Sequence, residues 1–171
     1  GTRVHCMLAA LAAVLILADS AAQPATSVGE LAGLRLRDQY GVEDSLASHR
    51  GSVVVVMVVD AERLRGLKAW ERDLRERVEG FEVLRIAEVP LEPPTSYERV
   101  AATLAQQVPD GVSVLIDLER RWAAKLGLDA GRPTLLLVDR EGRLAATAAG
   151  RHEPALAAEV AARLAALVGA P

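Results

Sequence analysis

Residues 53–60 have the sequence VVVVMVVD, a run of seven apolar residues, six of them valine, closed by Asp60. An unbroken run of β-branched residues is typical of a strand that is covered on both faces, as strands are in a parallel sheet. Asp60 can cap a helix that begins at Ala61 and extends to about Arg77. The stretch therefore predicts a central strand that leads directly into a helix.

Outward from this stretch, apolar runs alternate with helical patterns along the rest of the chain. A short strand and a hairpin are predicted at residues 34–41, and one helical turn at 44–50. Further strands are predicted at 81–89, 112–117, 134–139 and 143–147, with helices at 61–77, 96–108, 119–126 and 154–168. Strands that alternate with helices and end in a hairpin predict a three-layer α/β fold, with a central mixed sheet flanked by helices.

Length and composition favour one domain with an aliphatic core. The chain has 171 residues, of which 51% are hydrophobic and only 3% aromatic. Its formal net charge is −3, from 20 basic and 23 acidic residues that form no block of like charge. The sequence therefore carries neither a nucleic-acid-binding footprint nor a polybasic membrane patch.

The first 22 residues have the features of a secretory signal peptide. Arg3 precedes an apolar run from Cys6 to Ala18, which is shorter than the roughly 20 residues that span a bilayer. Small residues follow at 20–22, so we expect cleavage before Gln23. Residues 23–30 are then a flexible leader, and residues 31–171 the folded domain, exported to the periplasm or secreted, with no stable membrane insertion after cleavage.

An alternative remains for this segment: the apolar run could stay as an uncleaved membrane anchor. Lipidation is disfavoured because it requires a cysteine after the apolar run, whereas Cys6 lies before it. Cys6 is the only cysteine in the chain, so the cleaved protein would have no thiol. A disulfide framework, a cysteine metal site and a cysteine nucleophile are then all excluded.

Several strings, in this order, resemble the thioredoxin-like superfamily, in particular redoxins of the alkyl hydroperoxide reductase and thiol-specific antioxidant type. The entry segment contains LRDQYG at 36–41 and RGS at 50–52. Later strings are ID at 116–117 with AAKLGL at 123–128, then GRPT at 131–134 with LVDREGR at 137–143. The resemblance covers roughly residues 31–168 and implies that the Arg132–Pro133 bond is cis, in a loop that packs against the redox motif.

The sequence departs from this family at its reactive position. The family carries a reactive cysteine just after the first core strand, where the helix N-terminus lowers the thiol pKa. The corresponding stretch, DAERLR at residues 60–65, contains no Cys, Ser or Thr. Dithiol exchange and peroxide reduction therefore lack their nucleophile, and no catalytic residue is assigned.

Charged residues at that position, with the loop that the resemblance places beside them, are the candidate partner-binding residues. Arginines near a helix N-terminus could hold a carboxylate or a phosphate, although a solvated first turn is the simpler explanation of these charges. The candidates are Asp60, Glu62, Arg63, Arg65, Arg132 and Pro133.

The remaining residues suggest no further chemistry. His49 and His152 have no Cys or His neighbours, so we expect surface histidines and no metal site. Trp70 and Trp122 are expected in the core, and Asp139 with Glu141 in a hairpin turn. No phosphate-binding glycine loop or dinucleotide fingerprint is present, so no cofactor is expected.

Two functions follow from these features. The first is a non-catalytic module that binds a protein or an extended peptide. The alternative, implied by the resemblance alone, is thiol-disulfide oxidoreductase or peroxiredoxin-class antioxidant activity that uses a partner's cysteine. Fold does not dictate function, so the missing nucleophile favours the first. The sequence indicates no oligomeric state.

Overall fold

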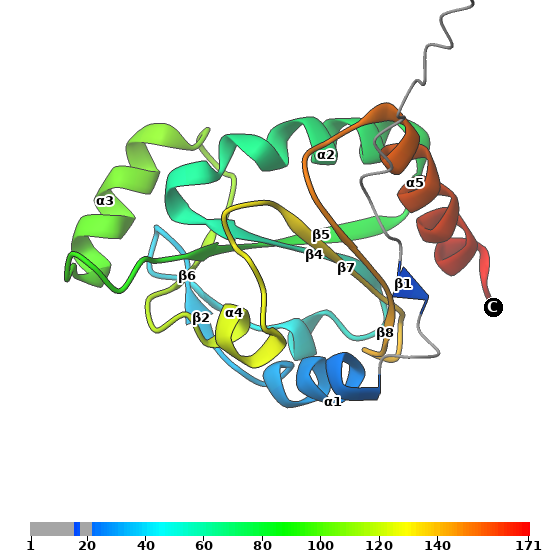
Figure 1. The fold of residues 1–171 in the computed structure, drawn as a ribbon, viewed down its shortest axis with the longest axis horizontal. Coiled ribbons are helices and arrows are strands. Elements are labelled where there is room, and N and C mark those ends of the chain that lie inside the picture. The colour runs from blue at the N-terminus through cyan, green and yellow to red at the C-terminus, as the bar shows by residue number, and fades with distance from the viewer. Residues whose placement is uncertain (1–15, 18–21) are drawn as a thin grey trace, which may run out of the picture.

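A computed structural model describes residues 16–17 and 22–171 of the chain. A central sheet with strand order β1-β8-β7-β4-β5-β6 lies between two layers of helices, as Figure 1 shows. The strands are β1 (Ile16–Leu17), β4 (Val53–Asp60), β5 (Phe81–Glu88), β6 (Leu115–Asp117), β7 (Thr134–Val138) and β8 (Leu144–Ala149). β4 pairs parallel with β5 and antiparallel with β7, so the sheet is mixed, as predicted.

The helices cover both faces of this sheet. They are α1 (Ala22–Leu31), α2 (Arg65–Arg77), α3 (Tyr97–Gln107), α4 (Arg121–Leu126) and α5 (Pro154–Gly169). In Figure 1, α2 and α5 lie on one face of the sheet, and α1 and α4 on the other. A separate hairpin, β2 (Leu36–Arg37) with β3 (Glu43–Asp44), precedes a 3₁₀ turn at Leu46–His49.

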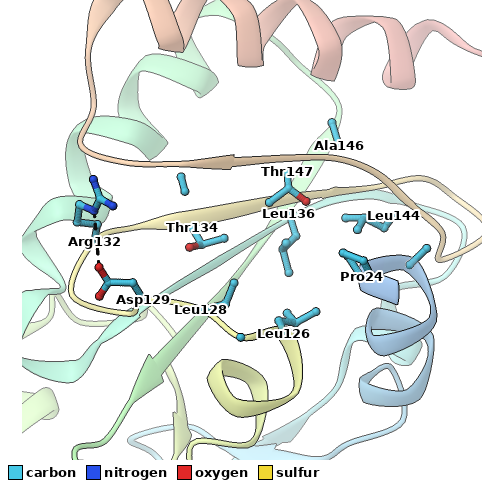
Figure 2. Close-up of a pocket in the computed structure, with 13 residues that line it drawn as sticks. Pro24, Leu126, Leu128, Asp129, Arg132, Thr134, Leu136, Leu144, Ala146 and Thr147 are labelled. Carbon is cyan, nitrogen blue, oxygen red and sulfur yellow. Dashed lines mark ion pairs between the residues drawn. The ribbon is translucent and has the colours of Figure 1, made fainter. Parts of the chain in front are cut away.

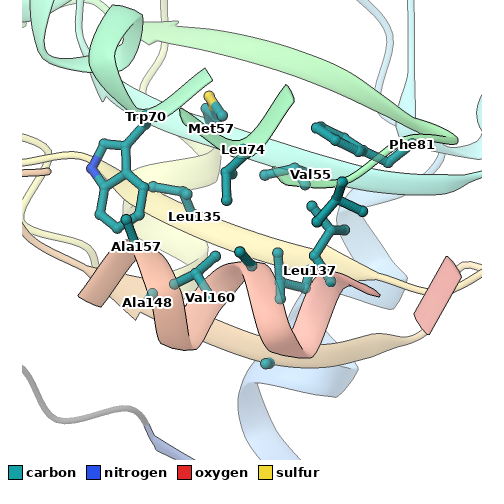
Figure 3. Packing of buried hydrophobic residues seen from close by; sticks show 14 of the residues in the cluster. Val55, Met57, Trp70, Leu74, Phe81, Leu135, Leu137, Ala148, Ala157 and Val160 are labelled. Carbon is teal, nitrogen blue, oxygen red and sulfur yellow. The ribbon is translucent and has the colours of Figure 1, made fainter. Parts of the chain in front are cut away.

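Alternation along β4 explains why its sequence is apolar throughout. Val55 and Met57 belong to the core beneath α2 and α5, together with Trp70 (Figure 3). Val54 and Val56 belong to the core beneath α1 and α4. Successive strand residues point to opposite faces, so a strand between two helical layers needs an apolar residue at every position.

Residues 23–30 are not a flexible leader, which corrects the expected domain boundary. They form most of α1, and Val28 is fully buried against the sheet, with Leu31 and Ala32 close behind it. Spacings of three and four residues place these side chains on one face of the helix. Pro24 lies in the first turn, where a helix tolerates proline, so the apolar face of α1 decides its structure.

The expected signal peptide falls mostly on residues 1–15 and 18–21, which lie outside the described residues. The exception is β1, which pairs antiparallel with β8 and places Ile16 opposite Thr147. Within the described residues, no helix is both long and apolar enough to span a bilayer. Cleavage before Gln23 stays a prediction.

Candidate functional site

The predicted site residues gather where β4 ends and α2 begins. A 3₁₀ turn, Ala61–Arg63, connects the two elements. Glu62, Arg63 and Arg65 are exposed, and their side chains make no hydrogen bond or ion pair with any described residue. These three charges are therefore free to meet a partner.

Asp60 does not cap the helix, contrary to the sequence-based expectation. Its side chain makes no capping hydrogen bond. Instead, Nη1 of Arg120 donates to Oδ1 of Asp60 at 3.0 Å. Arg120 has φ of 54°, the left-handed region that non-glycine residues rarely adopt. The ion pair holds Arg120, at the start of α4, against the end of β4.

Pro133 packs against the first turn of α2. A Cβ atom on Gly66 would lie only 3.2 Å from Cγ of Pro133, so the loop before β7 touches the turn that carries the exposed charges. Neighbouring Arg132 is exposed and pairs with Asp129 at 3.8 Å. We call Glu62, Arg63, Arg65 and Arg132 the charged rim.

The resemblance implied a cis peptide bond between Arg132 and Pro133, and the structure does not have it. Among the described residues the cis peptide bond is Glu92–Pro93. The Arg132–Pro133 bond is therefore trans, and the expected cis bond is wrong.

A row of three carboxyl groups lies behind the rim, and the sequence analysis named only Asp60 among them, missing the buried Glu88 and Asp117. Asp60, Glu88 and Asp117 end three adjacent parallel strands and lie side by side in register. Asp60 and Asp117 directly follow apolar runs in the sequence, and this was the available signal for them, whereas Glu88 follows only Ile86 and Ala87 after Arg85. Carboxyl ends of parallel strands meet at one edge of a sheet, the usual place for a ligand in open α/β folds.

Glu88 is the most unusual member of the row. It is 0% exposed, and neither carboxyl oxygen has a hydrogen-bond partner among the described residues. Burial, reinforced by the neighbouring carboxylate of Asp117, raises the pKa of Glu88 to about 9. Glu88 is therefore protonated at neutral pH.

Asp117 has a structural role in the same row. Its carboxylate accepts the backbone N–H groups of Arg121 at 3.0 Å and Trp122 at 2.8 Å. These are donors that the first turn of α4 leaves unpaired. Asp117 is therefore the N-terminal anchor of α4 and lies beside Glu88.

Two hollows flank this region. One, of about 480 Å³, adjoins Glu62 and is bounded by Pro90, Pro93 and Arg99. The other, of about 300 Å³, lies on the α1 and α4 side of β7 and β8, with Asp129 and Arg132 at one end (Figure 2). The charged rim is thus bordered by cavities on both sides.

His49 and His152 hydrogen-bond to carboxylates near the protein surface. His49 lies between Glu82 at 2.7 Å and Asp44 at 2.8 Å, and His152 pairs with Asp73 at 2.6 Å. In the described part of the chain no group of three or more His, Cys, Asp or Glu side chains has the geometry of a metal site.

Trp70 and Trp122 are both buried, as predicted. Asp139 accepts the backbone N–H groups of Glu141 and Arg143, which confirms the predicted hairpin turn.

Comparison with known proteins places the chain by its fold. No model of a protein family matches the sequence, and no curated protein matches it either. Solved structures do match. The pneumococcal exposed lipoprotein thioredoxin Etrx1 from Streptococcus pneumoniae superimposes with a TM-score of 0.61 at 19% identity, covering 77% of this chain and 98% of that one.

Two further structures share the architecture. A putative thiol:disulfide interchange protein DsbE from Chlorobium tepidum has a TM-score of 0.56 at 20% identity, over 80% of this chain and 93% of its own. Peroxiredoxin Q from Xanthomonas campestris has a TM-score of 0.57 at 13% identity, over 81% and 94%. The chain therefore has the thioredoxin-like fold, with a mixed sheet between two helical layers, and contains a single cysteine, Cys6.

Proposed function

We propose that this chain is a redox-inactive module of thioredoxin-like fold that is exported and binds a protein or an extended peptide at the charged rim. The observation that carries the proposal is the turn after β4, which presents Glu62, Arg63 and Arg65 where a redoxin would present its nucleophile. These side chains are exposed and unpaired, a state that suits an intermolecular contact better than an internal one.

Arginine is well suited to such a contact. Its planar guanidinium group forms paired hydrogen bonds with carboxylates, and two unpaired arginines lie here within three residues. Pro133 supplies a buried, rigid support beside them. A partner with acidic or carboxyl-terminal groups therefore fits the rim.

Export is the second part of the proposal. It is supported by the apolar run at residues 6–18 and by the description of one structural neighbour as an exposed lipoprotein. N-terminal sequencing of the protein recovered from cells tests it. A chain that begins at Gln23 supports cleavage, and a chain that keeps residues 1–22 overturns it.

The absence of redox activity is tested by turnover. We expect the full chain neither to reduce a protein disulfide nor to consume peroxide with a thiol donor. Because Cys6 precedes the fold, the variant Cys6→Ser should behave identically. Turnover above a protein-free control in both proteins would overturn the proposal and favour the oxidoreductase alternative.

Binding at the rim is tested by crosslinking in cells and by identifying what co-purifies. The triple variant Arg63→Ala, Arg65→Ala and Arg132→Ala should lose the partner. A matched triple variant, Arg35→Ala, Arg72→Ala and Arg143→Ala, removes three exposed arginines elsewhere and should retain it. Equal loss in both variants would show that net charge, and not the rim, governs binding.

A further inference from the structure

β8 is the last long strand on one side of the sheet, with only the two-residue β1 outside it among the described residues. Its inner side pairs with β7, and Gly150 N–H donates to the carbonyl of Pro133 at 2.9 Å just beyond the strand. In an antiparallel pair, alternate residues direct their backbone groups toward the same neighbour. Residues 146 and 148 therefore bond to β7, whereas Thr147 and Ala149 direct their N–H and C=O groups to the outer edge.

This edge lacks the features that normally block strand addition. Its sequence from 144 to 149 is LAATAA, without charge or proline, although natural sheet edges are commonly protected by lysine, proline or a bulge. The register irregularity between β7 and β8 lies at the Leu144 end, away from Thr147 and Ala149.

The chain already places a strand on this edge. β1 consists of two residues that belong to the apolar run at 6–18. It pairs antiparallel with β8 and lies opposite Ala146 and Thr147. Ala149 is exposed and lies beyond the reach of β1 in the described residues. The edge is therefore competent for strand pairing, and among the described residues a strand lies opposite it only at Ala146 and Thr147.

The 300 Å³ hollow lies next to the same edge. Side chains of β7 and β8, among them Thr134, Leu136 and Thr147, line it together with Leu126 and Leu128 near α4 (Figure 2). Its volume is at the lower end of ligand pockets, about 300 Å³ or more, and its walls are mainly aliphatic. Residues directly opposite each other on paired strands share a face of the sheet, so a residue added opposite Thr147 or Ala149 faces the hollow.

We infer that the edge of β8 is a strand acceptor, which binds an extended aliphatic segment of a partner protein in antiparallel register with alternate side chains directed into the adjoining hollow. Main-chain hydrogen bonds would supply affinity and the hollow specificity, as in other cases of strand addition. The inference rests on the proposed function as a peptide-binding module and assigns it a second surface, apart from the charged rim. β1 occupies part of the acceptor, so its removal should strengthen binding.

The test uses the full chain and one defined probe. The probe is a fluorescent peptide with the sequence of residues 11–19, LAAVLILAD, extended by two lysines for solubility, and binding is followed by fluorescence anisotropy. In the variant Ile16→Pro, proline removes the backbone N–H of residue 16 and frees the edge. We expect this variant to bind the probe at least about tenfold more tightly than the unaltered chain, a difference of about 1.4 kcal/mol.

A second substitution removes the acceptor itself. Ala149→Pro in the Ile16→Pro background deletes an outward N–H at an edge position where proline is tolerated, and should abolish binding while leaving thermal unfolding unchanged. If that variant does not fold, hydrogen exchange decides: in the Ile16→Pro chain the probe should slow exchange of the Thr147 and Ala149 amides. Unchanged exchange at these amides would overturn the inference.

Alternation provides an internal control within the probe. Replacing two residues of one alternating set in the probe by aspartate should weaken binding about tenfold or more, whereas replacing two residues of the other set should change it by less than about threefold. Equal effects of both sets, or no saturable binding to the Ile16→Pro chain, would overturn the inference. Loss of partner capture in the arginine variants is measured separately, so the proposed function can stand or fail independently.

Discussion

The fold raises the pKa of both Glu88 and His49. The consequence for charge is opposite, because a raised pKa makes a glutamate neutral and keeps a histidine positively charged. Glu88 is buried between two other carboxyl groups in register and becomes neutral. His49 loses part of its solvent, which disfavours its charge, but hydrogen bonds to Asp44 and Glu82 outweigh this and raise its pKa. Both shifts make the stability of the fold depend on pH.

Replacing Glu88 by glutamine should stabilise the fold increasingly as pH rises. The pKa of Glu88 is about 9 in the folded chain against a reference value of 4.5, so its contribution is largest below pH 4.5 and declines between pH 4.5 and 9. Glutamine has nearly the same shape as glutamate and does not titrate. We expect urea unfolding to show little difference at pH 4 and a gain of about 1 kcal/mol or more at pH 8, since each unit of pKa shift corresponds to about 1.36 kcal/mol.

Glu76→Gln is the matched control for this experiment, because Glu76 is exposed on α2. It should leave the pH dependence unchanged. A difference between Glu88→Gln and the unaltered chain that stays constant from pH 4 to 8 would show that Glu88 is not protonated in the fold.

Replacing His49 by glutamine should cost stability mainly in mildly acidic solution. A raised histidine pKa contributes fully below the reference value of 6.5 and is lost as pH rises through the folded value. Since these side chains are partly exposed, solvent screening limits the effect to about 1 kcal/mol or less. Urea unfolding should show the largest loss near pH 6 and a smaller one at pH 8.5, and 1 M salt should reduce it. A loss that does not vary with pH would contradict the ion pairs.

At the scale of secondary structure, α1 and the end of β4 differ most from a simple reading of local sequence. α1 contains Pro24 and Gly29 among small polar residues, a composition common in loops. Its three-and-four spacing of apolar residues nevertheless matches the sheet face that it covers, and tertiary packing supplies most of the stability of a helix of this length.

Shortening Val28 should therefore destabilise the whole domain. The side chain is 0% exposed, and removing buried methyl groups leaves a cavity that neighbouring side chains fill only in part. We expect Val28→Ala to lower the free energy of unfolding by about 1–3 kcal/mol, measured by urea denaturation. Glu30→Ala, which changes an exposed residue of the same helix paired with Lys125, should have little effect. If Val28→Ala also left the free energy of unfolding unchanged, the segment would be the flexible leader that its composition suggested.

At the scale of the whole molecule, the sheet has a protected centre and a permissive edge. β4 has neighbours on both sides and helices on both faces, and every residue from 53 to 59 is buried. β8 has a two-residue neighbour on its outer side, and the segment at 91–95 is exposed. The stability of local opening should therefore fall from the centre outward.

Hydrogen exchange should reveal this gradient directly. We expect amides of β4 to exchange only through global unfolding, those facing outward from β8 through smaller openings, and those at residues 91–95 fastest of all. Mass spectrometry of peptides from the exchanging protein measures the order. Outward amides of β8 as well protected as β4 would mean that the edge is fully covered, against a strand acceptor.

What the sequence by itself determined was the order and type of the elements and the missing nucleophile. Hydrophobic periodicity and strand-ending residues are short-range properties, so the valine run, the amphipathic helix after it and the final hairpin could all be predicted from local patterns. The absence of Cys, Ser and Thr from residues 60–65 is likewise a fact of sequence, and it leaves that position without the nucleophile that the resemblance implies.

Only the tertiary structure decided which of these residues meet. Strand register brings Asp60, Glu88 and Asp117 together although they are far apart in sequence, and burial then protonates one and leaves another to anchor a helix. Long-range contact also turned Asp60 from a presumed cap into the partner of Arg120 and placed α1 in the core. Solvation and charge depend on neighbours in space, and no local pattern in the chain specifies those neighbours.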